Sequence, residues 1–342
     1  MRILAITPSF YPSIGGVETH VRRVSECLRE RGHEVTVLTH AEAPSREQLG
    51  SLRLHRLPRT SFLKAWRAAR PHIAAADIVH CHDAYSFLHF YSPSCWLPPR
   101  RPVFATFHGY EGYPIPAEAI RRRHFVRRHV INCLCMGEFI CRHYRTPCFA
   151  VSYGGVDPVP EPPPLPEEPS AVFLGRLAED TSLKLDLDAL VALREEYGKR
   201  LHLTVAGEGP LRPLAEKYVE AQGLWVKFVG AVSDPVPLLA EASFAFVSGY
   251  LAIWQALAYG RLAFAVYENE LKRDYLVTFP KVDKVLVISS NASHLAGALN
   301  ERLSNPSTGR EMRKAGALLA AGNSWDRVAD LYLDMYRAHG FE

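Results

Sequence analysis

The architecture can be inferred first from Ser248-Gly249-Tyr250-Leu251-Ala252-Ile253-Trp254-Gln255-Ala256-Leu257-Ala258-Tyr259-Gly260, which directly follows the apolar run Phe244–Val247. This pattern predicts a buried strand that ends at a glycine turn and continues at once into a short, alanine-rich helix. Such a helix points free backbone N–H groups and its positive dipole end beyond the strand, which suits a phosphate. An ordinary strand–helix unit of an α/β domain explains the same residues equally well.

Short apolar runs alternate with helical patterns along the whole chain, which is typical of parallel α/β folds. The clearest helical pattern spans Val17–Arg31 and ends at Gly32. The strands expected in the first half are Arg2–Ile6, Glu34–Thr39, Leu52–Leu57, Ile78–Cys81, Val103–Phe107, Val130–Cys135 and Phe149–Ser152. Those expected in the second half are Ala171–Leu174, His202–Val205, Val226–Val229, Phe244–Val247, Ala263–Val266 and Val285–Ser289.

A proline-rich segment separates the two series. Seven of the 14 residues in 157–170 are proline, so neither a helix nor a central strand can form there. We interpret this segment as a stiff, extended linker between an N-terminal domain, residues 1–156, and a C-terminal domain, residues 171–324. Two such domains would enclose a cleft lined by the carboxyl ends of their strands.

Composition limits the possible partners. The 342 residues carry a formal net charge of +4, which is too small to indicate nucleic-acid binding. No apolar run is long enough to span a membrane, and the N-terminal apolar stretch is too short for a signal peptide. Seven cysteines, an odd number, fit a reducing compartment. We therefore expect a cytoplasmic protein, with attachment to the inner face of the membrane left open.

Four of the cysteines lie close together in the sequence. Cys133 and Cys135 alternate along an expected strand, and Cys141 and Cys148 follow shortly after. A metal site is conceivable, but the spacing matches no standard zinc pattern. We favour buried structural thiols as the interpretation.

Several expected strands end in residues that can bind ligands. The Gly15-Gly16 pair opens a helix, His108 ends an apolar strand, and Arg176 follows Gly175 after the first strand of the second half. Arginine is permanently charged and forked, which suits a diphosphate. The glycine pair and the histidine also have ordinary explanations: a turn and a structural histidine. The Gly207-Glu208-Gly209-Pro210 turn is likewise explained by a proline at a helix start.

The order of these motifs is more informative than any one of them. They are Gly15-Gly16-Val17-Glu18, His108-Gly109, Gly154-Gly155-Val156-Asp157, Gly175-Arg176-Leu177, Ala206-Gly207-Glu208-Gly209-Pro210-Leu211 and Ala256-Leu257-Ala258-Tyr259-Gly260. Together they resemble the retaining family-four glycosyltransferases over nearly the whole chain. The resemblance implies the GT-B fold: two Rossmann-like parallel-sheet domains that face each other across a cleft. In that family a C-terminal helix, here about residues 325–342, crosses back to the N-terminal domain.

The resemblance also implies an activity. A hexose would pass, with retention and without a metal, from a nucleotide-diphosphate sugar to a glycan or lipid-linked hydroxyl, with UDP, GDP and ADP all possible. The expected catalytic residues are His108 and Arg176, which the resemblance implies, and Lys184 as a candidate replacement for the family's lysine. The implied donor-binding residues are Gly15, Gly16, Gly175, Arg176, Gly207, Gly209, Gly249, Tyr250, Leu251, Ala252 and Gln255.

The chain departs from the family pattern at two places. The family's paired glutamates fall at Val247 and Gln255, and glutamine can bond a ribose hydroxyl but supplies no negative charge. The family's phosphate-binding lysine falls at Thr181, where Lys184 is either a replacement or a solvated helix residue. A catalytically inactive nucleotide-sugar-binding homologue or partner subunit is therefore the alternative.

A basic stretch is the candidate acceptor or membrane surface. Residues 117–130 contain five arginines against one glutamate, Glu118. Residues 61–70 add Lys64, Arg67 and Arg70 beside apolar side chains. Both stretches are either solvated helix faces or surfaces that attract anionic headgroups. The residues assigned to this role are Tyr110, Arg121, Arg122, Arg123, Arg127 and Arg128.

Overall fold

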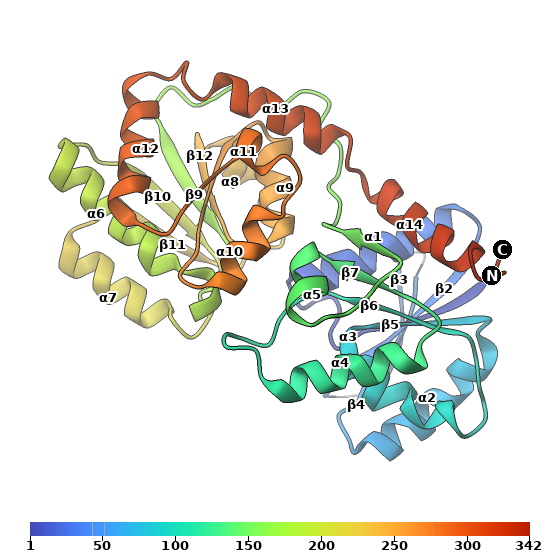
Figure 1. Cartoon of the computed structure of the whole chain (residues 1–342). Helices are drawn as coiled ribbons and strands as arrows, with labels where there is room; N and C mark the ends of the chain where they lie inside the picture. Colours follow the sequence, from blue (N-terminus) through green and yellow to red (C-terminus); the bar gives the residue numbers. More distant parts are fainter. Residues whose placement is uncertain (43, 51) are drawn as a thin grey trace. The chain divides into compact units, whose positions relative to one another are not determined.

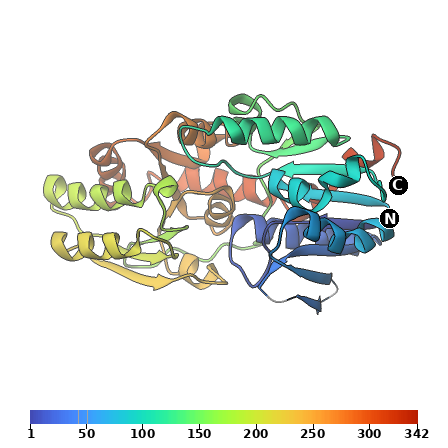
Figure 2. The same ribbon diagram turned by 90° about the horizontal axis from the view of Figure 1, so that it is seen from below.

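The computed structural model describes residues 1–42, 44–50 and 52–342, which form two compact units (Figure 1). Unit 1 comprises Met1–Gly154 together with Trp325–Glu342, and unit 2 comprises Gly155–Ser324. The chain therefore leaves unit 1 once, completes unit 2 and returns with its last helix. Both termini belong to unit 1 and lie near each other in both views of the ribbon (Figure 2).

Within the described residues, unit 1 is built on an eight-stranded sheet in the order β3-β4-β2-β1-β5-β6-β7-β8. Its strands are β1 (Arg2–Ile6), β2 (Glu34–Ala41), β3 (Ser45–Leu49), β4 (Leu52–Pro58), β5 (Ile78–His82), β6 (Val103–Phe107), β7 (Cys133–Met136) and β8 (Ala150–Ser152). Each pairing is parallel except that of β3 with β4. The sequence did not predict β3 because this edge strand is polar and mostly exposed.

The helices of unit 1 pack their apolar stripes on this sheet. They are α1 (Gly16–Glu30), α2 (Phe62–Ala75), α3 (Asp83–Ser86), α4 (Ala117–His129), α5 (Glu138–His143) and α14 (Trp325–Arg337), with short π and 3-10 turns at Phe87–Tyr91 and Ser92–Cys95. In α1 the buried side chains Val21, Val24 and Leu28 recur at helical spacing. Helix α14 packs on α1, and Arg31 at the end of α1 pairs with Asp330 at 3.0 Å. The expected return of the last helix to the first domain is thus confirmed.

Unit 2 has a six-stranded parallel sheet in the order β11-β10-β9-β12-β13-β14, counted over the described residues. Its strands are β9 (Ser170–Leu174), β10 (His202–Ala206), β11 (Val226–Gly230), β12 (Phe244–Val247), β13 (Leu262–Val266) and β14 (Leu286–Ser289). Its helices are α6 (Leu183–Tyr197), α7 (Arg212–Gln222), α8 (Val236–Ala240), α9 (Tyr250–Ala258), α10 (Glu270–Val277), α11 (Val282–Val285), α12 (Ala292–Ser304) and α13 (Arg310–Ala321), with a 3-10 turn at Glu179–Thr181.

The core of unit 2 joins the sheet to its helices. Phe173, Phe246 and Phe264 come from neighbouring strands and pack in one cluster with the apolar side chains of α6, α7 and α12. Helices α9 and α13 pack closely on each other, since a Cβ on Gly316 would meet the side chain of Leu257. Both sheets and their helices confirm the parallel α/β class expected from the alternating pattern.

The proline-rich segment is not a free linker. Residues 157–170 belong to unit 2, where the guanidinium of Arg261 donates to the carbonyls of Pro163 and Pro164 at 3.0 and 3.3 Å. The chain instead passes between the units at Gly154–Gly155 and Ser324–Trp325. Beside these points Val156 bridges to Ser324, and its N–H donates to the Asn323 carbonyl at 3.1 Å. Residues 157–169 form neither helix nor strand, as expected, whereas Ser170 already begins β9. The carbonyls of Pro163 and Pro164 have a partner on unit 2.

Candidate functional site

Each sheet has a point where its strand order reverses, and there a ligand can approach the carboxyl ends of the strands. In an open parallel sheet, the crevice outside the carboxyl ends opens where the strand order reverses. In unit 2 the reversal lies at β9, which has β10 on one side and β12 on the other. In unit 1 it lies at β1, between β2 and β5. The expected site residues mostly follow strands beside these points.

Arg176 follows β9 and lies at the surface of unit 2. Its side chain is 70% exposed, and its Nη2 donates to Asp180 at 2.7 Å. The guanidinium is therefore available to a ligand from solvent, but an anion must compete with a carboxylate one helical turn away. Unit 2 alone does not enclose this group.

The turn after β12 leads into α9, the helix whose first turn is expected to face the phosphates. Gly249 caps α9 in extended backbone, and Ser248 and Tyr250 are buried. The Tyr250 N–H donates to the hydroxyl of Tyr275 at 2.8 Å, and the two rings stack 4.0 Å apart. One of the amides expected to hold phosphates thus already has a side-chain acceptor. Leu251 and Ala252, in the same helical turn, are half-buried.

Lys272 is a buried cation that the sequence reasoning missed. It lies in α10, is 3% exposed, and its Nζ donates to the carbonyl and the hydroxyl of Ser248 at 2.6 and 2.8 Å. Burial lowers the pKa of Lys272 to about 8, with Asp180, Arg176 and Asp186 as the charges that act on it. The ammonium therefore lies against Ser248, between the end of β12 and the start of α9. In the sequence, the only sign of this lysine is that it follows the polar residues 268–270.

Asp186 is the acid nearest to this arrangement from α6. It is buried, and burial raises its pKa well above the usual range, against the opposing effect of Lys272. Among the described residues, its Oδ1 has no hydrogen-bond partner. Lys272 and Asp186 are thus two buried ionisable groups that interact electrostatically, and Lys272 bonds Ser248 at the end of β12.

The glycines after β10 have a packing explanation. A Cβ on Gly207 would collide with the carbonyl of Gly175, and one on Gly209 with the backbone of Leu177. The Leu177 N–H also donates to the Glu208 carbonyl at 2.9 Å. These glycines let the loops after β9 and β10 lie against each other, which shapes the strand-end surface around Arg176.

Lys184 and Gln255 lie less favourably for direct phosphate contact. The Lys184 ammonium donates to both oxygens of Asp188 at 2.7 and 2.9 Å and lies 4.8 Å from the centre of the Tyr218 ring on α7. Thr181, at the family's lysine position, is buried and donates to the Ala178 carbonyl at 2.7 Å. Gln255 is half-buried in the second turn of α9.

His108 follows β6 in unit 1 and is 9% exposed. Its Nε2 lies 2.9 Å from Nδ1 of His82, and its backbone N–H donates to Asp83 at 2.8 Å. Burial, and secondarily Arg123, lowers the pKa of His108 to about 3, so its imidazole is neutral. Asp83 has a left-handed φ of 64°, an uncommon conformation for a residue other than glycine.

A network of buried histidines and tyrosines surrounds His108. His20 lies 2.8 Å from the Tyr332 hydroxyl, and His80 lies 2.7 Å from the Tyr336 hydroxyl. Burial lowers the pKa of His20, His80 and His82 well below the usual range. We call His20, His80, His82 and His108 the histidine cluster. Its members and partners come from α1, the ends of β5 and β6, and α14, so no local motif could reveal it.

Gly15 and Gly16 open α1 as expected. A Cβ on Gly15 would collide with the carboxylate of Glu18, which accepts a hydrogen bond from the Ser9 hydroxyl. Around Gly16 there is open space. The loop is therefore compact at Gly15 and accessible at Gly16.

The arginines of α4 do not form a single basic face. Arg123 is only 2% exposed, donates to the Gly109 carbonyl and to Glu111, and lies 3.7 Å above the Tyr144 ring. A membrane or acceptor surface cannot include it, because the guanidinium holds the loop after His108 from inside. The other residues expected at the acceptor or membrane surface have different surroundings. Arg121 and Arg122 pair with Glu118, Arg127 donates to the Pro147 carbonyl, and Arg128 is exposed. The Tyr110 ring, before α4, packs on Phe139.

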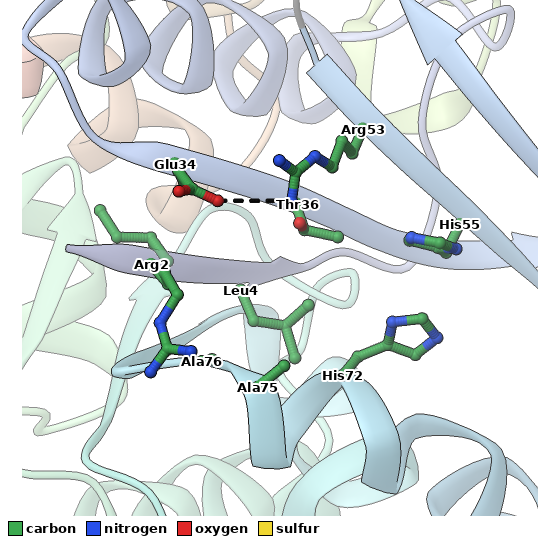
Figure 3. A pocket seen from close by; sticks show the side chains of 10 residues that line it. Arg2, Leu4, Glu34, Thr36, Arg53, His55, His72, Ala75 and Ala76 are labelled. Carbon is green, nitrogen blue, oxygen red and sulfur yellow. Dashed lines mark ion pairs between the residues drawn. The ribbon is translucent and has the colours of Figure 1, made fainter.

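A pocket of about 290 Å³ in unit 1 lies away from these strand ends (Figure 3). It is lined near the first residues of β1 and β2 and the end of α2, where Arg53 and Glu34 pair at 3.3 Å. Burial lowers the pKa of His72 in this pocket to about 4. Ligands of this class of sheet bind at the opposite edge. Across the described ranges, no helix combines the length and apolarity needed to cross a bilayer.

Comparison with known families agrees with this arrangement. The model described as Glycosyltransferase Family 4 matches residues 14–159, and the model described as Glycosyl transferases group 1 matches residues 168–305. The chain belongs to the family-four glycosyltransferases. The resemblance inferred from the strand-end motifs is therefore confirmed, and the two matches divide the chain where the proline-rich segment lies.

The curated relatives match this family-four chain either over a short stretch or at low sequence identity. A phosphatidylinositol N-acetylglucosaminyltransferase component from Arabidopsis thaliana is 36% identical over 66 residues, which cover 18% of this chain and 15% of that protein. The match to its human counterpart is 51% identical over 39 residues, 11% of this chain and 8% of that protein. The chain thus aligns with only a small part of these two proteins. An uncharacterized glycosyltransferase from Methanocaldococcus jannaschii is 23% identical over 271 residues, 67% of this chain and 68% of that protein.

Solved structures share the fold over the full length. A glycosyltransferase from Rickettsia africae superposes with a TM-score of 0.75 at 16% identity and covers 98% of both chains. HepE from Anabaena, solved in complex with UDP, also has a TM-score of 0.75, at 12% identity, over 99% of this chain and 100% of its own. These neighbours are GT-B glycosyltransferases, so the expected fold class is confirmed.

Proposed function

We propose that this family-four glycosyltransferase moves a hexose, with retention, from a nucleotide-diphosphate sugar to a lipid-linked or glycan hydroxyl. The observation that carries the proposal is the pairing of β9 with β12, which puts Leu174 opposite Val247. The residues that follow, Arg176 and the Ser248–Gly249 turn, therefore leave the same edge of the sheet at its reversal point. Charge and backbone donors meet there, which is what a leaving diphosphate requires.

In this proposal the diphosphate is stabilised by protein groups without a metal ion. Arg176 forms charged hydrogen bonds to the phosphate oxygens in place of its bond to Asp180. The start of α9 offers its dipole and the backbone N–H groups of its first turn. Lys272 adds positive potential from behind Ser248, and we assign to it the second charge that the family places at the Thr181 position. Gln255 bonds the ribose hydroxyls as donor and acceptor.

His108 acts on the transferred sugar as a neutral group. With its pKa lowered to about 3, the imidazole cannot serve as a general acid near neutral pH. It instead offers a hydrogen bond of fixed direction: His82 orients the ring, and the bond from the backbone N–H of His108 to Asp83 holds the backbone. We expect His108→Gln to lower the transfer rate while leaving the Kd for the nucleotide unchanged.

The names of the relatives support a membrane lipid as the acceptor. The Arabidopsis and human proteins, and a GDP-mannose-dependent mannosyltransferase from Mycobacterium tuberculosis, are all named for phosphatidylinositol substrates. On this chain the exposed start of α2 is the better candidate for a membrane-facing surface than α4. Phe62 and Leu63 are 50% and 45% exposed there, beside exposed basic residues at 64, 67 and 70.

A specific observation favours the second candidate, a nucleotide-sugar binder without transferase activity. Val247, at the family's first glutamate position, is buried and apolar. No carboxylate can therefore act from that position on an oxocarbenium-like centre. Binding without turnover is the property that separates this candidate from the first.

The test combines binding with turnover. UDP-, GDP- and ADP-sugars are added to the full chain, and the melting temperature is measured for the native protein and for Arg176→Met. We expect one nucleotide to raise the Tm, since saturation at about 100 times Kd adds roughly 2.7 kcal/mol, and the variant to lose this shift. Release of the nucleotide from the donor that depends on phosphatidylinositol vesicles then identifies transfer, whereas release without them identifies hydrolysis of the donor by water. No shift with any nucleotide contradicts the donor site, and a shift without release supports the second candidate.

A further inference from the structure

Three thiols converge at the edge of the sheet in unit 1. The sulfur atoms of Cys135, Cys141 and Cys148 all lie within 4.8 Å of one another. The sulfurs of Cys141 and Cys148 are 3.3 Å apart. Cys135 is fully buried in β7, whereas Cys141 on α5 and Cys148 just before β8 are half-buried. We call these three residues the thiol cluster.

The backbone around β7 brings the thiol cluster together. Gly137 has a left-handed φ of 100°, which only glycine adopts readily, and it turns the chain from β7 into α5. Its N–H donates to the Ser152 carbonyl of β8 at 2.7 Å. This turn returns α5 over the end of β7, so that Cys141 lies close to Cys135. The chain then runs back toward β8 and brings Cys148 to the same place.

Burial of three uncoordinated thiols gives little reason for their sulfur atoms to lie this close together. Thiols are weak donors and weak acceptors, so three of them in mutual contact gain little from their hydrogen bonds. A tetrahedral Zn²⁺ with Zn–S bonds of about 2.3 Å places its ligand sulfurs about 3.8 Å apart. That spacing lies between the 3.3 Å separation and the 4.8 Å limit found here. Thiolates are soft ligands and favour Zn²⁺ over Mg²⁺ or Ca²⁺.

We propose that Cys135, Cys141 and Cys148 bind one structural Zn²⁺ ion as thiolates. Each ligating thiol releases its proton to solvent, so the ion and its three ligands together carry one negative charge. A positive group is close by, because Arg127 donates to the Pro147 carbonyl at 2.9 Å, next to Cys148. The fourth position is open to water or to Cys133, which lies two residues before Cys135 on the same face of β7.

The ion would join three elements that the chain holds together only weakly. Strand β8 has three residues and lies at the edge of the sheet, and α5 is a helix of six residues. Zn²⁺ would tie both to β7, directly before the chain leaves unit 1 at Gly154. Its role is to hold this edge in place, separate from the donor chemistry assigned to unit 2.

The experiment uses the full chain purified under reducing conditions, with zinc content measured and the metal-free protein titrated with Co²⁺. We expect one equivalent of metal and the near-ultraviolet absorption of thiolate-bound Co²⁺, abolished by added Zn²⁺. Cys141→Ser and Cys148→Ser should each lose this band. Cys95→Ser is the matched control, since Cys95 is also half-buried but lies outside the thiol cluster.

A second measurement protects the test against misfolded variants. A zinc chelator should lower the Tm of the native protein and of Cys95→Ser by roughly 5 °C or more, but leave Cys141→Ser unchanged. The proposal is overturned if the reduced protein binds no Co²⁺, or if Cys141→Ser retains the full equivalent. A Cys141–Cys148 disulfide in protein purified under reducing conditions, found by mass spectrometry, overturns it as well.

Discussion

Replacing Lys272 by methionine tests the proposed second charge of the diphosphate site. The side chain is buried, and its two hydrogen bonds end on Ser248, the residue directly before the cap of α9. Methionine has a similar length and fits an apolar surrounding, so the change removes mainly the charge. The ammonium acts on the diphosphate through space and through the position of Ser248.

The expected loss of affinity follows from Coulomb's law. A full charge about 7 Å from a phosphate charge, at an effective dielectric of about 20, contributes roughly 2 kcal/mol. This corresponds to a Kd about thirtyfold weaker for the nucleotide diphosphate. The pKa of Lys272, lowered to about 8, adds a pH dependence: affinity of the native protein should fall as the pH rises through 8.

Folding stability should respond in the opposite direction. The native state binds fewer protons than the unfolded chain between the lowered pKa, about 8, and the ordinary value of 10.5. The contribution of Lys272 to the free energy of unfolding therefore rises with pH across this window. Below pH 8, burial of the charged ammonium lowers the free energy of unfolding by on the order of 3 kcal/mol. Lys272→Met should remove this cost.

Isothermal titration with UDP, GDP and their sugars at several pH values measures the affinity, and urea unfolding at the same values measures stability. Lys217→Met, an exposed lysine on α7, is the matched control and should change neither. Lys184→Met tests the rival cation and should weaken binding less than about twofold, because its ammonium is paired with Asp188. Equal binding by Lys272→Met and the native protein, or a large loss in Lys184→Met, would refute the assignment.

Four further outcomes are expected. Asp180→Asn should tighten nucleotide binding by roughly two- to fivefold in calorimetry, because it frees Arg176 from an exposed ion pair; weaker binding would mean that Asp180 itself serves the ligand. Gly207→Ala should lower the free energy of unfolding by about 1–3 kcal/mol in urea through its backbone collision, and an unchanged value would contradict the packing role. Arg123→Met should cost about 1.5–3 kcal/mol yet leave flotation with anionic vesicles unchanged. The histidine cluster, whose pKa values are lowered, should make stability fall below about pH 6.5 by up to roughly 1.4 kcal/mol per histidine and pH unit, a loss that glutamine replacements should reduce.

Most of the fold could be predicted because many of its strands, among them β5, β6, β12 and β13, are buried on both faces. Runs such as Val103–Phe107 and Phe244–Val247 are apolar throughout or nearly so, and each forms a strand with the expected bounds. The exception, Ser45–Leu49, pairs only along one edge and therefore needs no apolar residues. The proline-rich segment illustrates a different limit, since composition describes its stiffness but not the arginine that holds it.

The candidate site was only partly predictable. Residues that directly follow strands, such as His108 and Arg176, can be located from the strand alone. Lys272 is 24 residues from the serine it holds, and His20 is 312 residues from its tyrosine partner. Contacts over such separations depend on the complete topology. Arg123 shows the converse: the two preceding arginines, Arg121 and Arg122, are exposed, and a helical stretch with five arginines gives no sign that one of them is buried.

The return of α14 to unit 1 has a consequence for how the protein is made. Tyr332 and Tyr336 hydrogen-bond the buried imidazoles of His20 and His80, but both tyrosines are synthesised only after the whole of unit 2. Because domains fold as units during synthesis, unit 2 can fold before unit 1 is complete. Until α14 is made, the histidines of unit 1 lack their tyrosine partners. A stop codon after unit 2 would thus damage the half of the molecule that was translated first.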